Sequence, residues 1–172
     1  MVTFSVADLN RMDRPAFTQA LGAVFESAPW VAERSWAARP FTTVEALHAA
    51  MAAVVRQAPR AVQLAFLRAH PDLAGRAACA GAMSASSVAE QASAGLDRLT
   101  EAEYERFNRL NAAYRKRFGF PFIIAVRRHD KTGILAAFER RLGHTADEEV
   151  EAALAQVFDI TRGRLDGLVT AS

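Results

Sequence analysis

The residues of this chain with the clearest capacity for acid–base chemistry are His70 and Glu90. An imidazole has the unperturbed pKa nearest to neutrality, so His70 can both donate and accept a proton. Ser87, Glu90 and Gln91 stand at positions i, i+3 and i+4, which share one side of a helical turn. Two short segments could therefore bring an imidazole, a carboxylate and a carboxamide together.

Both segments also have a purely structural interpretation. His70 precedes a proline, and a residue in that position is pushed out of the α-helical region. The helix expected to begin at Pro59 should therefore end beside His70, where the ring could serve only to bond a nearby carbonyl. Ser87 and Glu90 could likewise form a capping box that only holds the start of a helix.

The helical phase of Arg164 predicts that a third functional side chain faces the protein interior. At about 100° per residue, Arg164 lies within roughly 20° of Val157, on the apolar stripe of the last expected helix. A buried arginine is costly unless it is paired or binds an anion, and its planar fork of donors suits a carboxylate. Arg164 is therefore either an anion-binding residue or one half of a structural ion pair.

The composition fits one globular domain over residues 1–172. Hydrophobic residues make up 51% and charged residues 23%, which argues against disorder. The net charge is +2, and the basic runs at 115–117 and 127–128 are too short to indicate nucleic-acid binding. Cys79, the only cysteine, is expected to be a small packing residue. Without a membrane-length apolar run or a signal-peptide pattern, we expect a soluble cytoplasmic protein that binds no membrane.

Helix start and stop signals recur along the chain and predict an all-α, single-domain multi-helix bundle. The apolar run with Gly119 and Pro121 interrupts the helical period, so one short irregular or extended segment is expected near 119–126. Such a stretch also offers free backbone groups to a ligand. The helices are expected at 13–27, 42–55, 59–70, 87–95, 100–119, from about 133, and 145–168.

Sequence motifs for metal and cofactor binding are absent. The chain has no His-Glu-x-x-His, no Cys/His cluster and no Gly-x-Gly-x-x-Gly or phosphate loop. We therefore expect no metal site and no cofactor of the kind that a Gly-rich loop binds. His48, His129 and His144 are expected to be surface residues.

Taken together, these segments resemble the family of 2-oxo-4-hydroxy-4-carboxy-5-ureidoimidazoline (OHCU) decarboxylases, which act in urate breakdown. The likeness covers nearly the whole chain. Its most specific blocks are His70-Pro71-Asp72-Leu73 and the segment Phe118-Gly119-Phe120-Pro121-Phe122-Ile123. Further matches are Leu9-Asn10, the segment 25–30, Arg39-Pro40-Phe41, Ala94-Gly95-Leu96, Leu110-Asn111, Tyr114 and Ile160.

The resemblance implies an all-helical, cofactor-free homodimer that converts the small molecule OHCU to (S)-allantoin and carbon dioxide. On the family pattern, His70 matches the catalytic histidine, Glu90 belongs to the polar group that contacts the ligand, and Arg164 matches the site arginine. Our hypothesis is that these three residues are catalytic, with His70 as general acid and base and Glu90 orienting it or the substrate hydroxyl. The implied substrate-binding residues are Pro71, Ser87, Gln91, Phe122, Ile123, Ile124 and Val126. The alternative function is a non-catalytic helical interaction module, in which Arg164 forms a core ion pair.

Overall fold

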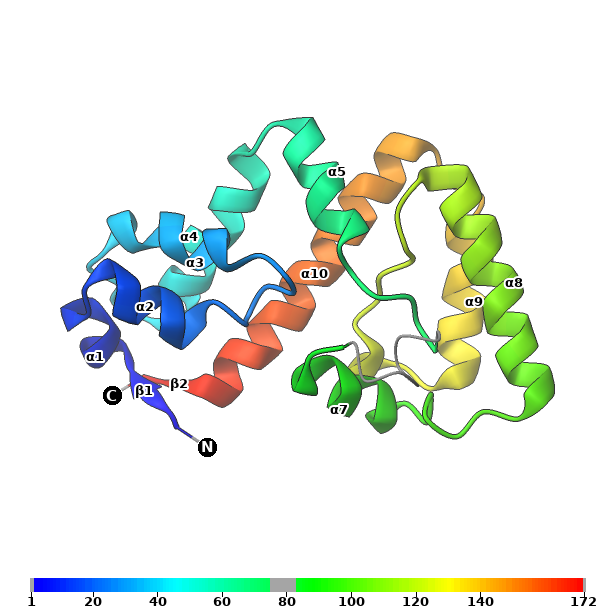
Figure 1. Ribbon diagram of the computed structural model, residues 1–172, viewed down its shortest axis with the longest axis horizontal. Helices are drawn as coiled ribbons and strands as arrows, with labels where there is room; N and C mark the ends of the chain where they lie inside the picture. The colour runs from blue at the N-terminus through cyan, green and yellow to red at the C-terminus, as the bar shows by residue number, and fades with distance from the viewer. Residues whose placement is uncertain (1, 75–82, 172) are drawn as a thin grey trace. The chain divides into compact units, whose positions relative to one another are not determined.

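The computed structural model describes residues 2–74 and 83–171 (Figure 1). The chain divides into two compact units. The first unit comprises residues 1–66 and 158–172, and the second unit comprises residues 67–157. Helical elements dominate both, as the sequence predicts, while a single domain over residues 1–172 stays a prediction. Cys79 lies outside the described residues.

Short helices with side-chain caps build the first unit. Ser5 caps the first helix through a reciprocal box with Asp8, Asp13 caps the second, and Thr43 caps the fourth. The elements are β1 (Phe4–Ser5), α1 (Val6–Arg11), α2 (Arg14–Leu21), α3 (Pro29–Ser35), η1 (Trp36–Ala38), α4 (Val44–Gln57), most of α5 (Arg60–Arg68), the end of α10 (Ala146–Leu168) and β2 (Val169–Thr170).

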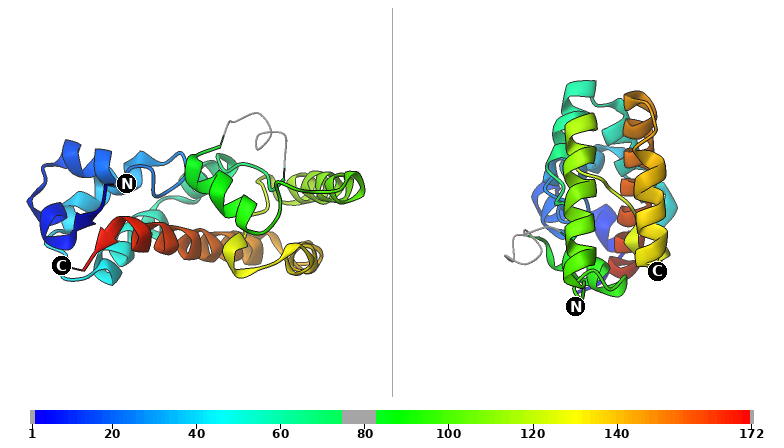
Figure 2. Two further views of the ribbon diagram at one scale, coloured as in Figure 1. Left: turned by 90° about the horizontal axis from the view of Figure 1, so that it is seen from below. Right: turned by 90° about the vertical axis from the view of Figure 1, so that its right-hand side faces the viewer.

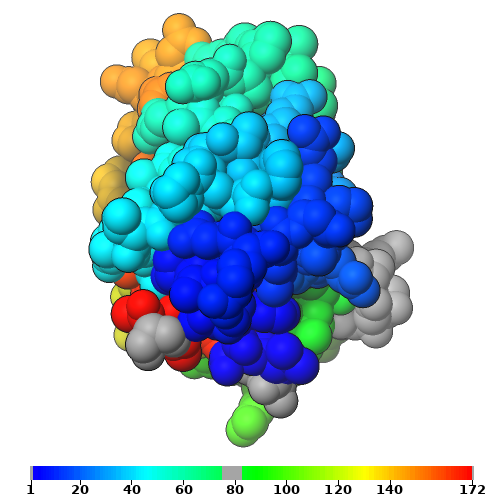
Figure 3. All heavy atoms as spheres, turned by 90° about the vertical axis from the view of Figure 1, so that its left-hand side faces the viewer, coloured from blue at the N-terminus to red at the C-terminus, as the bar shows by residue number. Residues whose placement is uncertain are grey.

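The core of the first unit lies where α3 packs against α2 and α4. Phe17, Leu21 and Met51 are fully buried there. At the edge of this unit, β1 and β2 pair in parallel, with Phe4 opposite Val169. Figure 3 shows the C-terminal residues, in red, beside the N-terminal residues, in dark blue. This pair joins segments at the two ends of the sequence.

The second unit holds the longer helices. Its elements are the end of α5, α7 (Ala85–Ser93), α8 (Glu101–Phe118), η2 (Val126–Arg128), α9 (Lys131–Arg141) and the start of α10. Helices α8 and α9 lie side by side (Figure 2), and α7 packs against η2. Aromatic rings fill the space between them: Tyr114 meets Phe122 edge-on at 5.4 Å between centroids, and Phe122 stacks on Phe138 at 3.9 Å.

The structure confirms several predicted helix ends and corrects others. The box of Thr100 and Glu103 starts α8, and the last helix starts at the predicted Thr145 signal. Helix α2, by contrast, ends at Leu21 and not near residue 27. Helix α9 begins at Lys131, earlier than expected, because the Asp130 side chain caps it.

Gly119 ends α8 in the left-handed conformation, with φ of 79°. Among the described residues, a Cβ there would meet only the end of the Arg68 side chain, at 3.9 Å, so the left-handed conformation should be what penalises other residues. We expect Gly119→Ala to lower the free energy of unfolding by about 1 kcal/mol, measured by urea denaturation. Gly163→Ala is the matched control and should gain stability, because Gly163 is helical and no atom of the described part of the chain lies within 4 Å of a Cβ placed there. Equal effects at both positions would contradict this explanation.

Two of the three histidines expected at the surface are partly buried. Nε2 of His48 lies 2.9 Å from the hydroxyl of Thr161, and burial lowers the pKa of His48. Nδ1 of His144 lies 3.0 Å from the carboxylate of Glu149. His129 is exposed as predicted. In the described part of the chain, no helix combines the length and the apolar character that crossing a membrane requires.

Candidate active site

His70 follows the end of α5, as its position before a proline predicts. The helix stops at Arg68, and the His70 N–H donates to the carbonyl of Leu67 at 3.2 Å. The His70 side chain is half-buried. Pro71 comes next and is also half-buried, so the segment that carries the imidazole leaves the helix before it turns inward at Leu73.

Two arginines hold the start of this segment from outside. Nε of Arg68 donates to the carbonyl of Gly119 at 3.1 Å, which links the end of α5 to the end of α8. Nε of Arg115 donates to Oδ1 of Asp72 at 2.8 Å. The contact with Asp72 lies two residues beyond His70, so it restrains the backbone on which the imidazole sits.

Two buried carboxamides hold the rest of the segment. Nδ2 of Asn111 donates to the carbonyl of Leu73 at 2.8 Å. Oε1 of Gln91 accepts from the Ala74 N–H at 3.0 Å, and its Nε2 lies 3.4 Å from the sulfur of Met83. The Gln91 carboxamide therefore connects α7 to the segment that carries His70.

The start of α7 differs from the prediction. Ser84, three residues earlier than expected, is the N-cap, and its hydroxyl accepts from the Ser87 N–H at 3.2 Å. Ser87 and Glu90 are thus inside the helix and do not form its capping box. Their exposed fractions are 7% and 8%, and that of Gln91 is 7%. The capping interpretation of Ser87 and Glu90 is wrong, and a buried carboxylate needs another explanation.

The apolar segment at 119–126 is irregular, as predicted, and almost entirely buried. The carbonyl of Ile123 accepts from Arg141 at 2.6 Å, and the Ala125 N–H donates to Gln156 at 2.9 Å. Within residues 2–74 and 83–171, no acceptor lies within hydrogen-bond reach of the N–H groups of Phe122, Ile123 and Ile124. Buried donors of this kind are rare in folded proteins, so this backbone is suited to bind a ligand.

The second unit therefore brings most of the predicted site residues together. Gln91 bonds the segment that follows His70, and α7 packs against η2, which begins at Val126. Glu90 lies on the same helix as Gln91. One compact unit thus holds an acid–base group, a buried carboxylate and three N–H donors that have no acceptor among the described residues.

Arg164 belongs to the first unit and is paired there. Its Nη1 lies 3.0 Å from Oε2 of Glu26 and 3.1 Å from the carbonyl of Val24. The side chain is 9% exposed, which agrees with the helical-phase prediction. The ion pair named as the structural alternative is therefore present. A role toward a substrate anion stays a proposal for Arg164.

The sequence interpretation missed a buried ionic cluster in the second unit, formed by Tyr114, Arg141, His144 and Glu149. Oε1 of Glu149 accepts from the Tyr114 hydroxyl at 2.5 Å and from Nε of Arg141 at 2.6 Å. The sequence does indicate that Arg141 is buried. Arg141 lies seven residues after Ile134 and three after Phe138, so it shares their buried side of the helix. Helical phase therefore places Arg141 on the buried side of α9, as it places Arg164 on that of α10.

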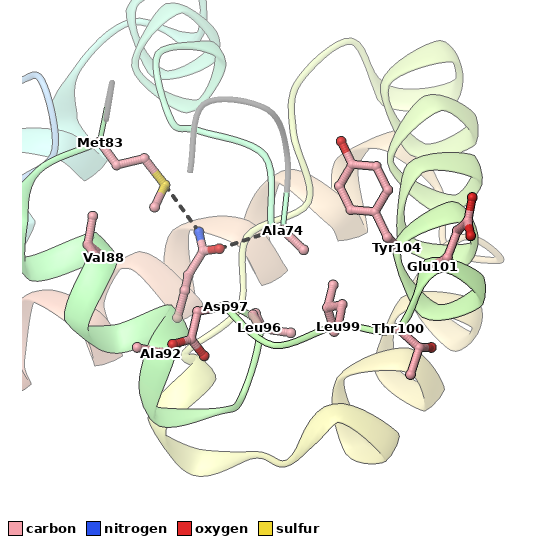
Figure 4. A pocket seen from close by; sticks show the side chains of 11 residues that line it. Ala74, Met83, Val88, Ala92, Leu96, Asp97, Leu99, Thr100, Glu101 and Tyr104 are labelled. Carbon is pink, nitrogen blue, oxygen red and sulfur yellow. Dashed lines mark hydrogen bonds between the residues drawn. The ribbon is translucent and has the colours of Figure 1, made fainter. Parts of the chain in front are cut away.

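A pocket of about 540 Å³ opens beside α7 in the second unit (Figure 4). Its wall is mainly apolar, and Val88, Leu96 and Tyr104 contribute to it. Gln91 also lines it, with its carboxamide already bonded to Ala74. Among the described residues, no group of three or more His, Cys, Asp or Glu could hold a metal ion.

Fold and site together define an all-α protein with acid–base side chains and buried backbone donors in one unit. The family model described as OHCU decarboxylase matches residues 10–166. This chain belongs to the OHCU decarboxylase family.

Individual relatives agree with the family match. The chain is 46% identical to the 2-oxo-4-hydroxy-4-carboxy-5-ureidoimidazoline decarboxylase of Haloferax volcanii, with 96% of each chain covered. It is 42% identical to the Uric acid degradation bifunctional protein PucL of Bacillus subtilis, over 97% of this chain and 33% of that protein. A crystal structure of (S)-allantoin synthase superposes with a TM-score of 0.76 at 36% identity, over 97% of this chain and 54% of that one.

Proposed function

We propose that this protein is a carboxy-lyase that converts OHCU to (S)-allantoin and carbon dioxide in urate breakdown. Family membership and the names of the relatives support this reaction. The main structural support for this function is the set of three buried N–H groups at Phe122, Ile123 and Ile124, which lack an acceptor among the described residues. These donors belong to the same compact unit as His70. A substrate rich in ureido and ring carbonyl oxygens would accept from such donors.

The reaction requires the protein only to orient groups and to move protons. The bond from the ring carbon to the carboxylate breaks, and its electron pair passes into the adjacent carbon–nitrogen double bond of the substrate itself. The hydroxyl on that ring carbon then loses its proton and becomes a carbonyl, and the neighbouring carbon gains a proton. The ring nitrogen that received the electron pair takes up one further proton from solvent. Because the substrate ring absorbs the electrons, the chain has only to orient groups and move protons.

We assign the proton transfers to His70, which can accept the hydroxyl proton and deliver one to carbon. The restraints on the segment after His70, by Arg115 on Asp72 and by Asn111 on Leu73, support this role because they fix the backbone that carries the imidazole. Glu90 would orient the imidazole or the substrate hydroxyl. Burial of the Glu90 carboxylate in mid-helix, without a capping role, supports its inclusion.

Binding is assigned to the remaining residues that the family pattern implies. Gln91 and the backbone at 122–124 would meet the ureido and ring amides, and Pro71, Ser87 and Val126 would contact other parts of the substrate. Arg164 would hold an anionic or carbonyl oxygen of the substrate. Its pairing with Glu26 supports this role in one respect, because it sets the guanidinium in one orientation before any ligand binds.

The stereochemistry of the product tests the proposed function. The substrate can be generated in solution from urate with the preceding oxidase and hydrolase, and allantoin formation can be followed by circular dichroism. Spontaneous decay gives racemic allantoin, whereas the protein should give the (S) enantiomer at a faster rate. A purified protein that changes neither the rate nor the optical activity would leave the helical interaction module, with its Arg164–Glu26 ion pair, as the better explanation.

We also propose that the protein is a homodimer, as the family resemblance implies. We propose that it is cytoplasmic, because a chain with a single cysteine fits a reducing compartment. Sedimentation equilibrium of the purified protein measures the assembly directly. A species at the 18.7 kDa mass of one chain across the micromolar range would contradict the dimer.

A further inference from the structure

The substrate-binding backbone proposed above lacks the regular hydrogen bonds that would hold it in place. Residues 121–125 are neither helix nor strand. A backbone donor is useful to an enzyme only when its direction is fixed before the substrate arrives. Something outside this segment must therefore fix the peptide groups that carry the donors.

Arg141 contacts the segment at two adjacent residues. Its Nη1 donates to the carbonyl of Ile123 at 2.6 Å, and its guanidinium lies 4.4 Å from the centre of the Phe122 ring. The Phe122 ring is held on its own account by stacking on Phe138, with 12° between the planes. One guanidinium from α9 thus restrains a side chain and a peptide group that lie next to each other.

The contact with Ile123 determines where the next N–H points. The carbonyl of Ile123 and the N–H of Ile124 belong to the same planar peptide group, and in a trans peptide they point in opposite directions. Fixing the carbonyl toward Arg141 therefore aims the Ile124 N–H away from Arg141. A cationic donor on the carbonyl also polarises the peptide group, which makes its N–H a better donor.

Arg141 is itself prevented from moving. Its side chain is 5% exposed, and its Nη2 lies 2.5 Å from Oε1 of Glu149, which is fully buried. The same carboxylate accepts from the Tyr114 hydroxyl, and its other oxygen faces His144. Burial, together with the Glu149 carboxylate, raises the pKa of Tyr114, so the hydroxyl keeps its proton and remains a donor.

A buried ion pair of this kind adds little to stability when compared with well-packed apolar residues. Its geometry does have a specific effect, because it sets the direction of a substrate-binding peptide group. We propose that Arg141 is a positioning residue for substrate binding, which acts by aiming the Ile124 N–H at a carbonyl oxygen of the substrate. This inference rests on the proposed function, and Arg141 is not expected to touch the reacting atoms.

Steady-state kinetics separate this role from a structural one. The variant Arg141→Met/Glu149→Leu removes both charges, so no unpaired charge is left buried. The Ile124 N–H would bind a part of the substrate that does not react, so its loss should raise KM about tenfold and change kcat less than about threefold. Arg141→Lys keeps the charge without the planar fork and should give an intermediate KM.

The exposed ion pair Arg106–Glu139 offers the matched control in the same unit. Arg106→Met/Glu139→Leu should keep the original KM, because neither residue forms a hydrogen bond or an ion pair with the segment at 119–126. If the double variant at Arg141 does not fold, Arg141→Lys decides the question. Unchanged KM values in the folded Arg141 variants would overturn the inference.

A direct readout is available in the unaltered protein. On titration of ¹⁵N-labelled protein with (S)-allantoin, the Ile124 amide proton should move downfield as it forms a new hydrogen bond. An Ile124 amide that stays in place would overturn the inference even if no variant folds. Failure of the proposed function is distinguishable, because the unaltered protein would then not accelerate allantoin formation.

Discussion

His70→Asn should lower kcat/KM for OHCU by about 10²–10⁴-fold, the range that positioned acid–base groups contribute. Asparagine is similar in size and retains hydrogen-bonding groups, but it cannot exchange a proton near neutral pH. The fold should persist, because the ring is half-buried and the segment is held by neighbouring side chains such as Arg115 and Asn111. The measurement is the initial rate of (S)-allantoin formation, with a thermal melt of the same sample.

His129→Asn is the control for this substitution. His129 is exposed and lies just before α9, so its replacement should leave both the rate and the melting temperature unchanged. Full activity in a well-folded His70→Asn protein would remove the imidazole from the mechanism. Glu90 would then be the remaining candidate for the proton transfers.

Glu149→Leu should lower the free energy of unfolding by about 3–5 kcal/mol, because it leaves the Arg141 guanidinium buried and unpaired. The carboxylate is fully buried and is the common partner of Arg141, Tyr114 and His144. The Tyr114 hydroxyl also loses its acceptor, which adds to the cost. Urea denaturation followed by circular dichroism measures the effect.

The companion variant Arg141→Met/Glu149→Leu should be at least about 2 kcal/mol more stable than Glu149→Leu alone, since no buried charge remains. A double variant as unstable as the single one would show that the penalty comes from lost packing and lost hydrogen bonds and not from an unpaired charge. In that case the buried pair would be a structural requirement of the second unit.

Local sequence signals predicted the fold correctly wherever a proline or a glycine determines the backbone conformation. Pro71 ended α5 beside His70, and Gly119 ended α8 in the left-handed conformation that favours glycine. The irregular segment near 119–126 followed from the same reasoning, because glycine and proline interrupt the helical period there. In these places the backbone has few alternatives, so a short window of sequence is sufficient.

Local signals predicted the wrong helix start where several neighbouring residues can serve as the N-cap. Ser84, Ser86 and Ser87 can each cap a helix, and the glutamate three positions after Ser87 favoured the wrong one. In a similar way, Thr43 and not Thr42 caps α4. The choice between neighbouring caps is made by burial of the helix face, and that is a tertiary effect. In α7 the buried face includes Glu90 and Gln91.

Contacts between distant parts of the sequence could not be predicted from one chain. The pairing of Phe4 with Val169 joins residues from opposite ends of the sequence, and two-residue strands carry almost no alternating pattern. The Glu26 partner of Arg164 was equally out of reach. For Arg164 the helical phase predicted burial but could not distinguish a protein carboxylate from a ligand.

The parallel pairing of β1 and β2 has a practical consequence for extending this polypeptide. Two parallel strands run in the same direction, so the chain enters β1 at one end of the ladder and leaves β2 at the other. A tag or a second protein joined before β1 would therefore begin at one end of this ladder, and one joined after β2 would begin at the other end.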